Sequence, residues 1–323
     1  MNAIVERAGL LTSVQDLGRT GFRQFGVSPG GALDPFALRV ANLLVGNDEA
    51  AAGLELTFGG LQLQFEDDRV VAWCGGEFDV EVGSTSLPAG HAGRVRAGEK
   101  AKFGHAHAGC RCWVAVSGGI DVPVALGSRS TDLRAKFGGF KGRPLKDGDV
   151  IRLGTRPGSP IPATIEISAW SAPKPWSQTA SAAPVLRFVR GDAWNRFNAS
   201  TLQTLTSEAF AVSPDSDRMG VRFEGPMLSR IDDADLISEA VAPGTIQVPP
   251  SGKPILLLQD CQTIGGYPKI AHVITLDLGV AAQLRAGDQI RFSGISIGDA
   301  HRLLLQRESD LERFRIGLSL HEP

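Results

Sequence analysis

The segment QDCQTIGGYPKI, residues 259–270, combines polar side chains and glycines directly after the aliphatic run PILLL. It includes Tyr267, the only tyrosine of the chain. Gln259 and Gln262 could hydrogen-bond to a flat amide or carboxylate, and Lys269 could supply a positive counter-charge. A Gly-Gly hairpin with solvated polar residues is the structural alternative, and the residues alone leave both interpretations open.

Glycines and nearby polar residues extend this candidate site. Gly265 and Gly266 lack side chains, so the backbone there could approach a ligand or adopt a positive φ angle. Glu239 and Gln247 flank a glycine-centred turn in SEAVAPGTIQVPP, and Gln247 interrupts an apolar strand pattern. An outward-facing strand position would also explain Gln247.

A second group of charged residues lies in two glycine-rich stretches. Asp16 and Arg19 belong to TSVQDLGRTGFRQFG, and Arg129 belongs to GSRST, close to the basic stretch RAKFGGFKGRP. Arginines and backbone amides in such loops could contact an anion. The glycine spacing fits neither a Walker phosphate-binding loop nor a dinucleotide-binding fingerprint. An internal Asp–Arg pair that braces the first loop is the alternative.

The segment GHAHAGCRC, residues 104–112, holds four side chains that can bind soft metals: His105, His107, Cys110 and Cys112. In a strand–turn–strand each pair would share a face, which makes a tetrahedral zinc site conceivable. Zinc motifs, however, normally place their ligands on tight CxxC turns. We therefore predict a hairpin with core cysteines and no metal.

Two familiar hydrolase signatures are missing from the sequence, which contains neither GxSxG nor HExxH. Cys261 lies beside Asp260, but a Cys–His couple cannot be assigned from the sequence. His272 falls in a predicted strand and is expected to be structural.

The bulk composition limits the kinds of partner. The chain has 323 residues, 42% hydrophobic and 21% charged, which is typical of globular proteins and favours two domains. The net charge of -2 and the pI near 6.3 argue against nucleic-acid and membrane-surface partners. The N-terminus lacks a signal-peptide pattern, and no apolar run approaches the ~20 residues of a membrane span. Four cysteines do not predict a disulfide framework in such a chain, so a cytoplasmic location is expected.

The elements that must position these residues are mostly strands. The 39 glycines and 19 prolines separate many short Val-, Ile- and Leu-rich runs, which is typical of a mainly β protein with tight turns. The clearest helix covers residues 34–46, with Asp34 as N-cap and Pro35 at the first helical position. Further helical patterns cover residues 193–207 and the end of the chain, where Asp299 could act as a cap.

The chain is expected to divide into two domains. A segment rich in Pro, Ser and Ala, residues 171–184, is interpreted as a linker between domains at 1–170 and 185–323. The sequences LKDGDVIRLG and LRAGDQIRFSG share a pattern of Leu, Gly-Asp and Ile-Arg near the end of each domain. If this repeat reflects a duplication, the chain forms two related β-barrels with a ligand cleft between them.

Four blocks of sequence, in order along nearly the whole chain, resemble one known family. They are TSVQDLGRTGFRQFGVSPGGALDPFALRVANLLVGN, VAVSGGIDVPVALGSRSTDLRAKFGGFKGRPLKDGD, SDRMGVRFEGP and ISEAVAPGTIQVPPSGKPILLLQDCQTIGGYPKIAHVI. The chain is identified by them as a member of the KipA-like family, also described as the biotin-dependent carboxyltransferase or allophanate hydrolase subunit 2 family. The IQVPP and QTIGGYPKI blocks are the specific ones.

The resemblance implies two cyclophilin-like β-barrel domains with a cleft between them. It also implies the role of most stand-alone bacterial members, which is that of the C subunit in an ATP-dependent 5-oxoprolinase. Such a protein would be inactive alone and would act with two partners, one KipI-like and one LamB/YcsF-like, to open 5-oxoproline to glutamate. ATP with Mg²⁺ would be shared with or supplied by a partner.

The same resemblance implies two alternatives. In urea carboxylase-type enzymes the homologous region passes a carboxyl group from biotin to urea, so biotin would be a cofactor only in that case. The sequence shows no ATP-grasp domain and no biotin-carrier motif, which favours the oxoprolinase role. The second alternative is a non-catalytic, KipI-binding regulatory protein.

Chemistry within the matching blocks suggests the site residues. Those expected to be catalytic are Lys269, Gln259, Gln262 and Tyr267; those expected to bind substrate are Gln247, Arg218, Gly265, Gly266 and Glu239; and those expected to contact an anion or nucleotide are Asp16, Arg19 and Arg129.

Overall fold

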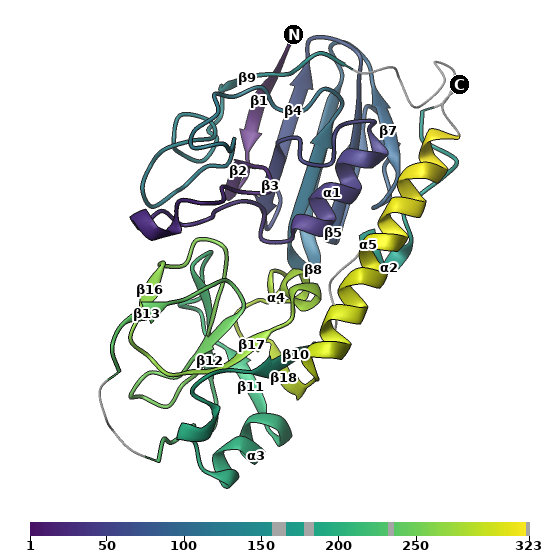
Figure 1. The fold of residues 1–323 in the computed structure, drawn as a ribbon. Helices are drawn as coiled ribbons and strands as arrows, with labels where there is room; N and C mark the ends of the chain where they lie inside the picture. The colour runs from purple at the N-terminus through teal and green to yellow at the C-terminus, as the bar shows by residue number, and fades with distance from the viewer. Residues whose placement is uncertain (157–165, 178–183, 232–235, 321–323) are drawn as a thin grey trace. The chain divides into compact units, whose positions relative to one another are not determined.

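The computed structural model describes residues 1–156, 166–177, 184–231 and 236–320, which fold into two units (Figure 1). Unit 1 comprises residues 1–19, 30–180 and 309–323, and unit 2 comprises residues 20–29 and 181–308. Strands dominate both units, and the described residues contain five α-helices. The predicted mainly β class with two β domains is confirmed.

Unit 1 is built on one nine-stranded, curled sheet. Its path runs β2-β3-β8-β4-β1-β9, and β5 pairs with β6, β7 and β8. Large apolar side chains from the long strands β5 and β8, including Trp73 and Val114, are buried in its core. The strands are β1 (Asn2–Ala8), β2 (Leu11–Gln15), β3 (Gly53–Thr57), β4 (Leu61–Phe65), β5 (Arg69–Val82), β6 (Thr85–Ser86), β7 (Ala92–Val95), β8 (Lys100–Val116) and β9 (Val150–Arg152).

Helix α1 (Pro35–Leu44) forms as its local signals predict. The Asp34 carboxylate accepts a hydrogen bond of 3.0 Å from the backbone N–H of Ala37, and Pro35 opens the first turn. Phe36 of α1 packs edge-to-face on Trp176 of the short helix α2 (Lys174–Ser177), with ring centroids 5.4 Å apart.

The predicted hairpin at residues 104–112 is wrong, because these residues all lie within the single strand β8. Gly109, inside this strand, has a positive φ of 66°. In the structure the pairing between β5 and β8 shifts register near this point, so the glycine accommodates an irregularity inside a long strand.

Unit 2 is a closed seven-stranded barrel in the order β10-β17-β14-β15-β12-β11-β18. Its interior holds clustered phenylalanines, among them Phe223 and Phe292 with ring centroids 5.4 Å apart. The barrel strands are β10 (Val185–Arg190), β11 (Ala209–Val212), β12 (Gly220–Glu224), β14 (Thr245–Gln247), β15 (Ile255–Leu257), β17 (Lys269–Val273) and β18 (Gln289–Gly294).

A small ribbon and several helices complete unit 2. A two-stranded ribbon joins β13 (Glu239–Ala240) to β16 (Ile264–Gly265). The remaining elements are α3 (Ala199–Ser207), α4 (Leu278–Ala281), α5 (Ile297–Ser319, whose residues from Ser309 belong to unit 1), and the 3-10 helices η1 (Arg23–Phe25), η2 (Trp194–Arg196) and η3 (Thr275–Asp277). The predicted helix over 193–207 is thus divided between η2 and α3. Ser296, rather than Asp299, caps α5, because the Asp299 N–H donates to the Ser296 hydroxyl.

The two Gly-Asp sequences form the same turn in their respective units. Gly148 and Gly287 have φ angles of 84° and 89°, which only glycine adopts easily. The following aspartates, Asp149 and Asp288, each accept a hydrogen bond from a backbone N–H three residues earlier. The turns lead into β9 and β18, so the local repeat has a structural counterpart.

The predicted linker at residues 171–184 contains α2 and includes residues 178–183, which lie outside the described residues. The predicted domain limits and the cleft between domains therefore stay predictions.

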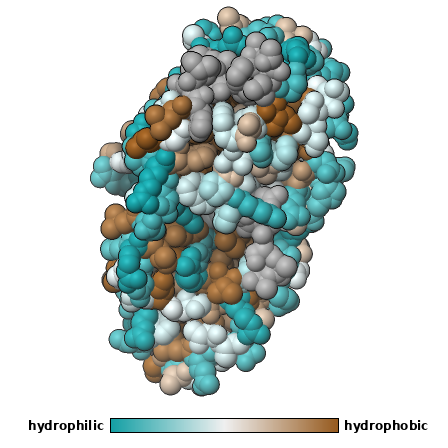
Figure 2. All heavy atoms as spheres, turned by 90° about the vertical axis from the view of Figure 1, so that its right-hand side faces the viewer, coloured by the Kyte–Doolittle hydropathy of each residue, from teal (hydrophilic) through white to brown (hydrophobic). Residues whose placement is uncertain are grey.

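On the face shown in Figure 2, apolar side chains are exposed between hydrophilic ones, as is usual for protein surfaces.

Candidate functional site on the outer face of the barrel

One row of residues crosses four neighbouring strands of the unit 2 barrel. Arg222 of β12 pairs with Ile255 of β15, which pairs with Gln247 of β14, which in turn pairs with Lys269 of β17. Residues paired in this way direct their side chains to the same face of a sheet. Phe223, the next residue on β12, points into the core, so the row faces outward.

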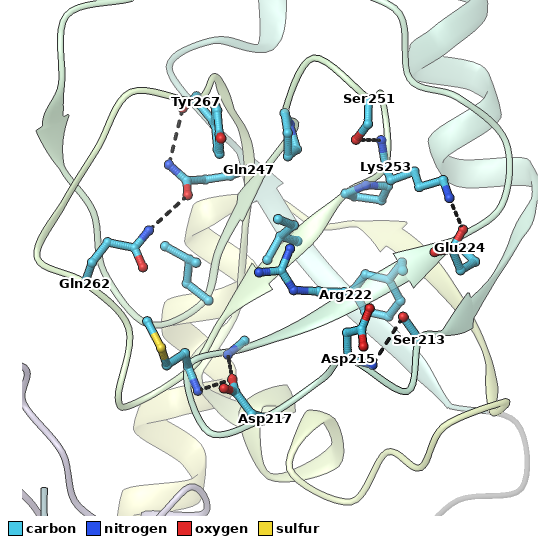
Figure 3. A pocket seen from close by; sticks show the side chains of 17 residues that line it. Ser213, Asp215, Asp217, Arg222, Glu224, Gln247, Ser251, Lys253, Gln262 and Tyr267 are labelled. Carbon is cyan, nitrogen blue, oxygen red and sulfur yellow. Dashed lines mark hydrogen bonds and ion pairs between the residues drawn. The ribbon is translucent and has the colours of Figure 1, made fainter. Parts of the chain in front are cut away.

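A cavity of about 400 Å³ lies over one end of this row (Figure 3). Its volume falls within the range of small-molecule sites, roughly 300–1,000 Å³. Residues from β12, β14 and β15 and from the loops that connect the strands line it, including Arg222, Gln247, Ile255, Gln262 and Tyr267. The sheet register therefore brings predicted residues of the QDCQTIGGYPKI segment together with residues from β12 and β14.

The two glutamines of the cavity contact one another. The Gln262 side-chain amide donates to the Gln247 carbonyl oxygen over 3.5 Å, and the Gln247 amide donates to the Tyr267 backbone oxygen over 3.4 Å. These distances are at the long limit of hydrogen bonds, so both amides can exchange these contacts for stronger ones with a ligand. Gln247 is buried, so the outward strand position does not leave it solvated.

The need for glycine at position 265 has a steric cause. Neither Gly265 nor Gly266 has a positive φ angle. A Cβ atom on Gly265 would lie only 2.7 Å from the Nε2 atom of Gln247. The glycine therefore provides the space that the Gln247 amide occupies.

Charged side chains surround the cavity, and the sequence interpretation missed the most relevant one. Lys253 forms an ion pair with Glu224, and Asp215 and Asp217 also line the cavity. Among the described residues, the Arg222 guanidinium has no ion-pair or hydrogen-bond partner, and it projects among the cavity side chains in Figure 3. Its signal in the sequence was the block SDRMGVRFEGP, where Arg222 alternates with apolar strand residues.

Lys269 lies in a smaller neighbouring pocket of about 200 Å³, and Tyr267 lines both pockets. Its ammonium group is 2.7 Å from a Glu239 carboxylate oxygen and 3.0 Å from one of Asp192. The hydrogen bond to Glu239, followed by the contact with Asp192, raises the pKa of Lys269 above its ordinary value. Lys269 is therefore a charged, carboxylate-bound group at neutral pH and is unsuited to act as a base.

Two predicted residues of the same region lie outside both pockets. Arg218 forms a buried bidentate ion pair with Asp260, with N–O distances of 2.7 and 3.1 Å. The pair anchors the turn that follows β15, since the Asp260 N–H also donates to the Arg218 backbone oxygen. Gln259 is half-buried in this turn and lines neither pocket.

Asp16, Arg19 and Arg129 come together in unit 1, where they form an internal network. The Asp16 carboxylate accepts hydrogen bonds from the hydroxyls of Ser128 and Ser130 and from the Arg129 backbone N–H. Arg19 is buried, and its guanidinium donates to the Ser130 backbone oxygen. Asp16 and Arg19 thus each bind the loop at 128–130, whereas the structural alternative expected an Asp–Arg pair that braces the first loop.

The candidate metal ligands do not form a cluster. His105 and His107 are exposed, whereas Cys110 and Cys112 are buried. His107 lies 2.6 Å from a carboxylate oxygen of Asp79. Throughout the described ranges, no three His, Cys, Asp or Glu side chains are placed to hold a metal ion.

The surroundings of Cys261 and His272 favour a structural role for both side chains. Burial is the largest cause that raises the pKa of the Cys261 thiol to about 11, so it is not a thiolate at neutral pH. Burial also lowers the pKa of His272, whose Nδ1 atom lies 3.2 Å from the Thr245 hydroxyl.

Among the described residues, no helix is both long enough and apolar enough to cross a membrane.

Comparisons with known proteins bear on the whole chain. Residues 25–294 match the family model described as "Carboxyltransferase domain, subdomain A and B". The chain is 38% identical over 309 residues to the C subunit of 5-oxoprolinase from Escherichia coli (strain K12), covering 95% of this chain and 94% of that protein. It is 38% identical over 303 residues to the C subunit of 5-oxoprolinase from Haemophilus influenzae, covering 94% of each.

A solved structure gives the same fold. The urea carboxylase of Kluyveromyces lactis matches with a TM-score of 0.89 and 30% sequence identity over 97% of this chain. This chain spans 29% of the length of that protein.

Proposed function

This chain belongs to the family of carboxyltransferase domains with subdomains A and B, and we propose that it acts as the C subunit of a 5-oxoprolinase. One observation carries the proposal: the 38% identity to two proteins of that name extends over 94% or more of this chain and of each relative. A match of this extent leaves little of either relative without a counterpart here.

The proposed reaction opens the cyclic amide of 5-oxoproline to glutamate. An amide carbonyl is a poor electrophile, and the opening is unfavourable near neutral pH unless it is coupled to another reaction. ATP would supply a phosphoryl group that activates the carbonyl, and two water molecules would complete the opening, with release of ADP and phosphate. Fixed donors near the carbonyl would stabilise the charge that develops on its oxygen.

Within this chain we assign substrate contact to the cavity on the outer face of the barrel. The side-chain amides of Gln247 and Gln262 can donate to and accept from a planar amide, and Tyr267 lines the same cavity. Lys269 and Glu239 would have a structural role in the neighbouring pocket, because the Lys269 ammonium group is already paired with carboxylates. Gln259 has no place in this arrangement.

The residues predicted to contact a nucleotide do not fit that role. The Asp16 carboxylate and the Arg19 guanidinium are buried and bonded within unit 1. The Arg129 side chain donates through Nε to the Val122 backbone oxygen. We therefore propose that ATP with Mg²⁺ binds on the partner proteins, one KipI-like and one LamB/YcsF-like.

Reconstitution tests the proposal. The purified chain is mixed with its KipI-like and LamB/YcsF-like partners, ATP and 5-oxoproline, and glutamate is measured by amino-acid analysis. Glutamate is expected from the complete mixture, and none is expected when this chain, either partner or ATP is omitted. A complete mixture of folded proteins that forms no glutamate would refute the role, as would full activity without this chain.

A second candidate is biotin-dependent carboxyl transfer to urea or a similar small amide. It is favoured by the description of the matched family and by the likeness to a urea carboxylase. This function requires biotin, so avidin should abolish the activity of the complex. Activity that is unchanged by avidin excludes it.

A further inference from the structure

The Arg222 side chain is the feature of the cavity that the proposed chemistry at the amide does not use. It is exposed on β12 and, within the part of the chain that the structure describes, has no partner of opposite charge. The other cation of the cavity, Lys253, is paired with Glu224. An arginine fork that faces a cavity and is not otherwise engaged is suited to bind a planar carboxylate through two parallel hydrogen bonds.

The sheet register sets the distance between this arginine and the amide-binding side chains. Arg222 and Gln247 are each paired with Ile255, so one strand separates them. With neighbouring strands about 4.8 Å apart, their backbones are about 10 Å apart. The half-buried Ile255 side chain lies between them and offers an apolar floor. This spacing suits a small flat molecule with a carboxylate at one end and an amide at the other.

The charges around the cavity limit the kind of anion. Three carboxylates line it, those of Asp215, Asp217 and Glu224, against the two cations Arg222 and Lys253. A polyanion, such as a nucleoside triphosphate, would be repelled by this excess of negative charge. A single carboxylate can instead pair with Arg222 alone.

We propose that this cavity binds a small planar amide that carries one carboxylate, with Arg222 as the carboxylate partner and Gln247 and Gln262 as the amide partners. The assignment deepens the proposed function and rests on it, because 5-oxoproline contains both groups in one ring. It makes Arg222 the residue that separates 5-oxoproline from amides without a carboxylate, such as urea.

Ligand binding to the purified full-length chain tests the assignment. Dissociation constants are measured by calorimetry or ligand-observed NMR, for the chain alone and for the chain mixed with its two partners. The probes are 5-oxoproline, 2-pyrrolidinone, which is the same lactam without the carboxylate, and inorganic phosphate. The variants are Arg222→Ala and Arg222→Lys, with Arg302→Ala as the matched control, since Arg302 is an exposed arginine on α5 outside the cavity.

The expected result is a selective loss of affinity for the ligand that carries a carboxylate. Arg222→Ala should weaken 5-oxoproline binding about tenfold or more and leave 2-pyrrolidinone binding unchanged. The affinity of Arg222→Lys for 5-oxoproline should lie between those of wild type and Arg222→Ala, because the positive charge remains and the guanidinium fork is lost. Arg302→Ala should match wild type for every probe.

Other outcomes overturn the assignment. Equal weakening of both lactams by Arg222→Ala would show no role in carboxylate recognition, and phosphate that displaces 5-oxoproline would indicate a general anion site. Failure of 5-oxoproline to bind the wild-type chain, both alone and with the partners, also overturns it. Selective binding without glutamate formation by the complete mixture would instead refute the proposed function and leave the site assignment standing.

Discussion

The buried ion pair between Arg218 and Asp260 should be essential to the stability of unit 2. Each side chain is only 7% exposed, and the two N–O distances are 2.7 and 3.1 Å. Replacing Asp260 by Asn keeps the shape of the side chain but leaves the arginine as a buried charge without its carboxylate. Breaking one partner of such a pair costs about 3–5 kcal/mol. For a unit of this size, that loss corresponds to a decrease of about 10 °C in the unfolding midpoint.

Differential scanning calorimetry is the suitable assay, because it can resolve separate transitions for the two units. Asp260→Asn should lower the unit 2 transition and leave the unit 1 transition unchanged. Asp299→Asn, which removes the carboxylate of an exposed pair with Arg302, should change neither transition. Adding Arg218→Met to Asp260→Asn should recover part of the loss, because no uncompensated charge then remains. A decrease of less than about 2 °C for Asp260→Asn would refute the reasoning, as would simple additivity in the double variant.

Two further predictions concern the cavity and the acid response. Gly265→Ala should displace the Gln247 amide, because the new Cβ would lie 2.7 Å from its nitrogen. The substitution should weaken 5-oxoproline binding about tenfold and change the unfolding midpoint little. Gly266→Ala is the matched control, and equal effects of the two substitutions on binding would contradict the steric explanation. Asp149 pairs with Arg143 over 2.7 Å, and this contact lowers the pKa of its carboxyl, so the folded state binds the proton less readily than the unfolded state. The pair therefore stabilises unit 1 above the ordinary carboxyl pKa and loses this contribution as the pH falls through the lowered value. Asp149→Asn should lower the unit 1 midpoint more at about pH 7 than at about pH 2, and an equal decrease at both pH values in calorimetry would count against it.

Local signals in the sequence predicted the elements whose causes are local. The helix at Pro35–Leu44 follows from one capping aspartate and one proline at its start, which act through contacts within a single turn. The paired Gly-Asp turns at 148 and 287 follow from glycine's tolerance of positive φ. Period-two alternation likewise indicated the mainly β class, since it reflects the two faces of a strand.

Features that depend on strand pairing were not visible in the same way. The segment GHAHAGCRC suggested a hairpin, but the long pairing of β8 with β5 continues past it, with a register shift near Gly109. Arg218 and Arg222 lie four residues apart in one block, SDRMGVRFEGP, yet one is buried against Asp260 and the other faces the cavity. Alternation with apolar residues indicates an outward position for Arg222, but only the tertiary structure shows which groups surround each arginine.

The sequence by itself determined that the chain is a mainly β protein of the family its blocks resemble, and it drew attention to Gln247, Gln262 and Tyr267. Those inferences depend on residue types and short spacings, which are read along one dimension. The tertiary structure decided that Arg222 joins these residues in one cavity and that Lys269 is bound by two carboxylates. The reason is physical: the register of β12, β15, β14 and β17 places residues up to 47 positions apart in one row, as the numbers 222 and 269 show.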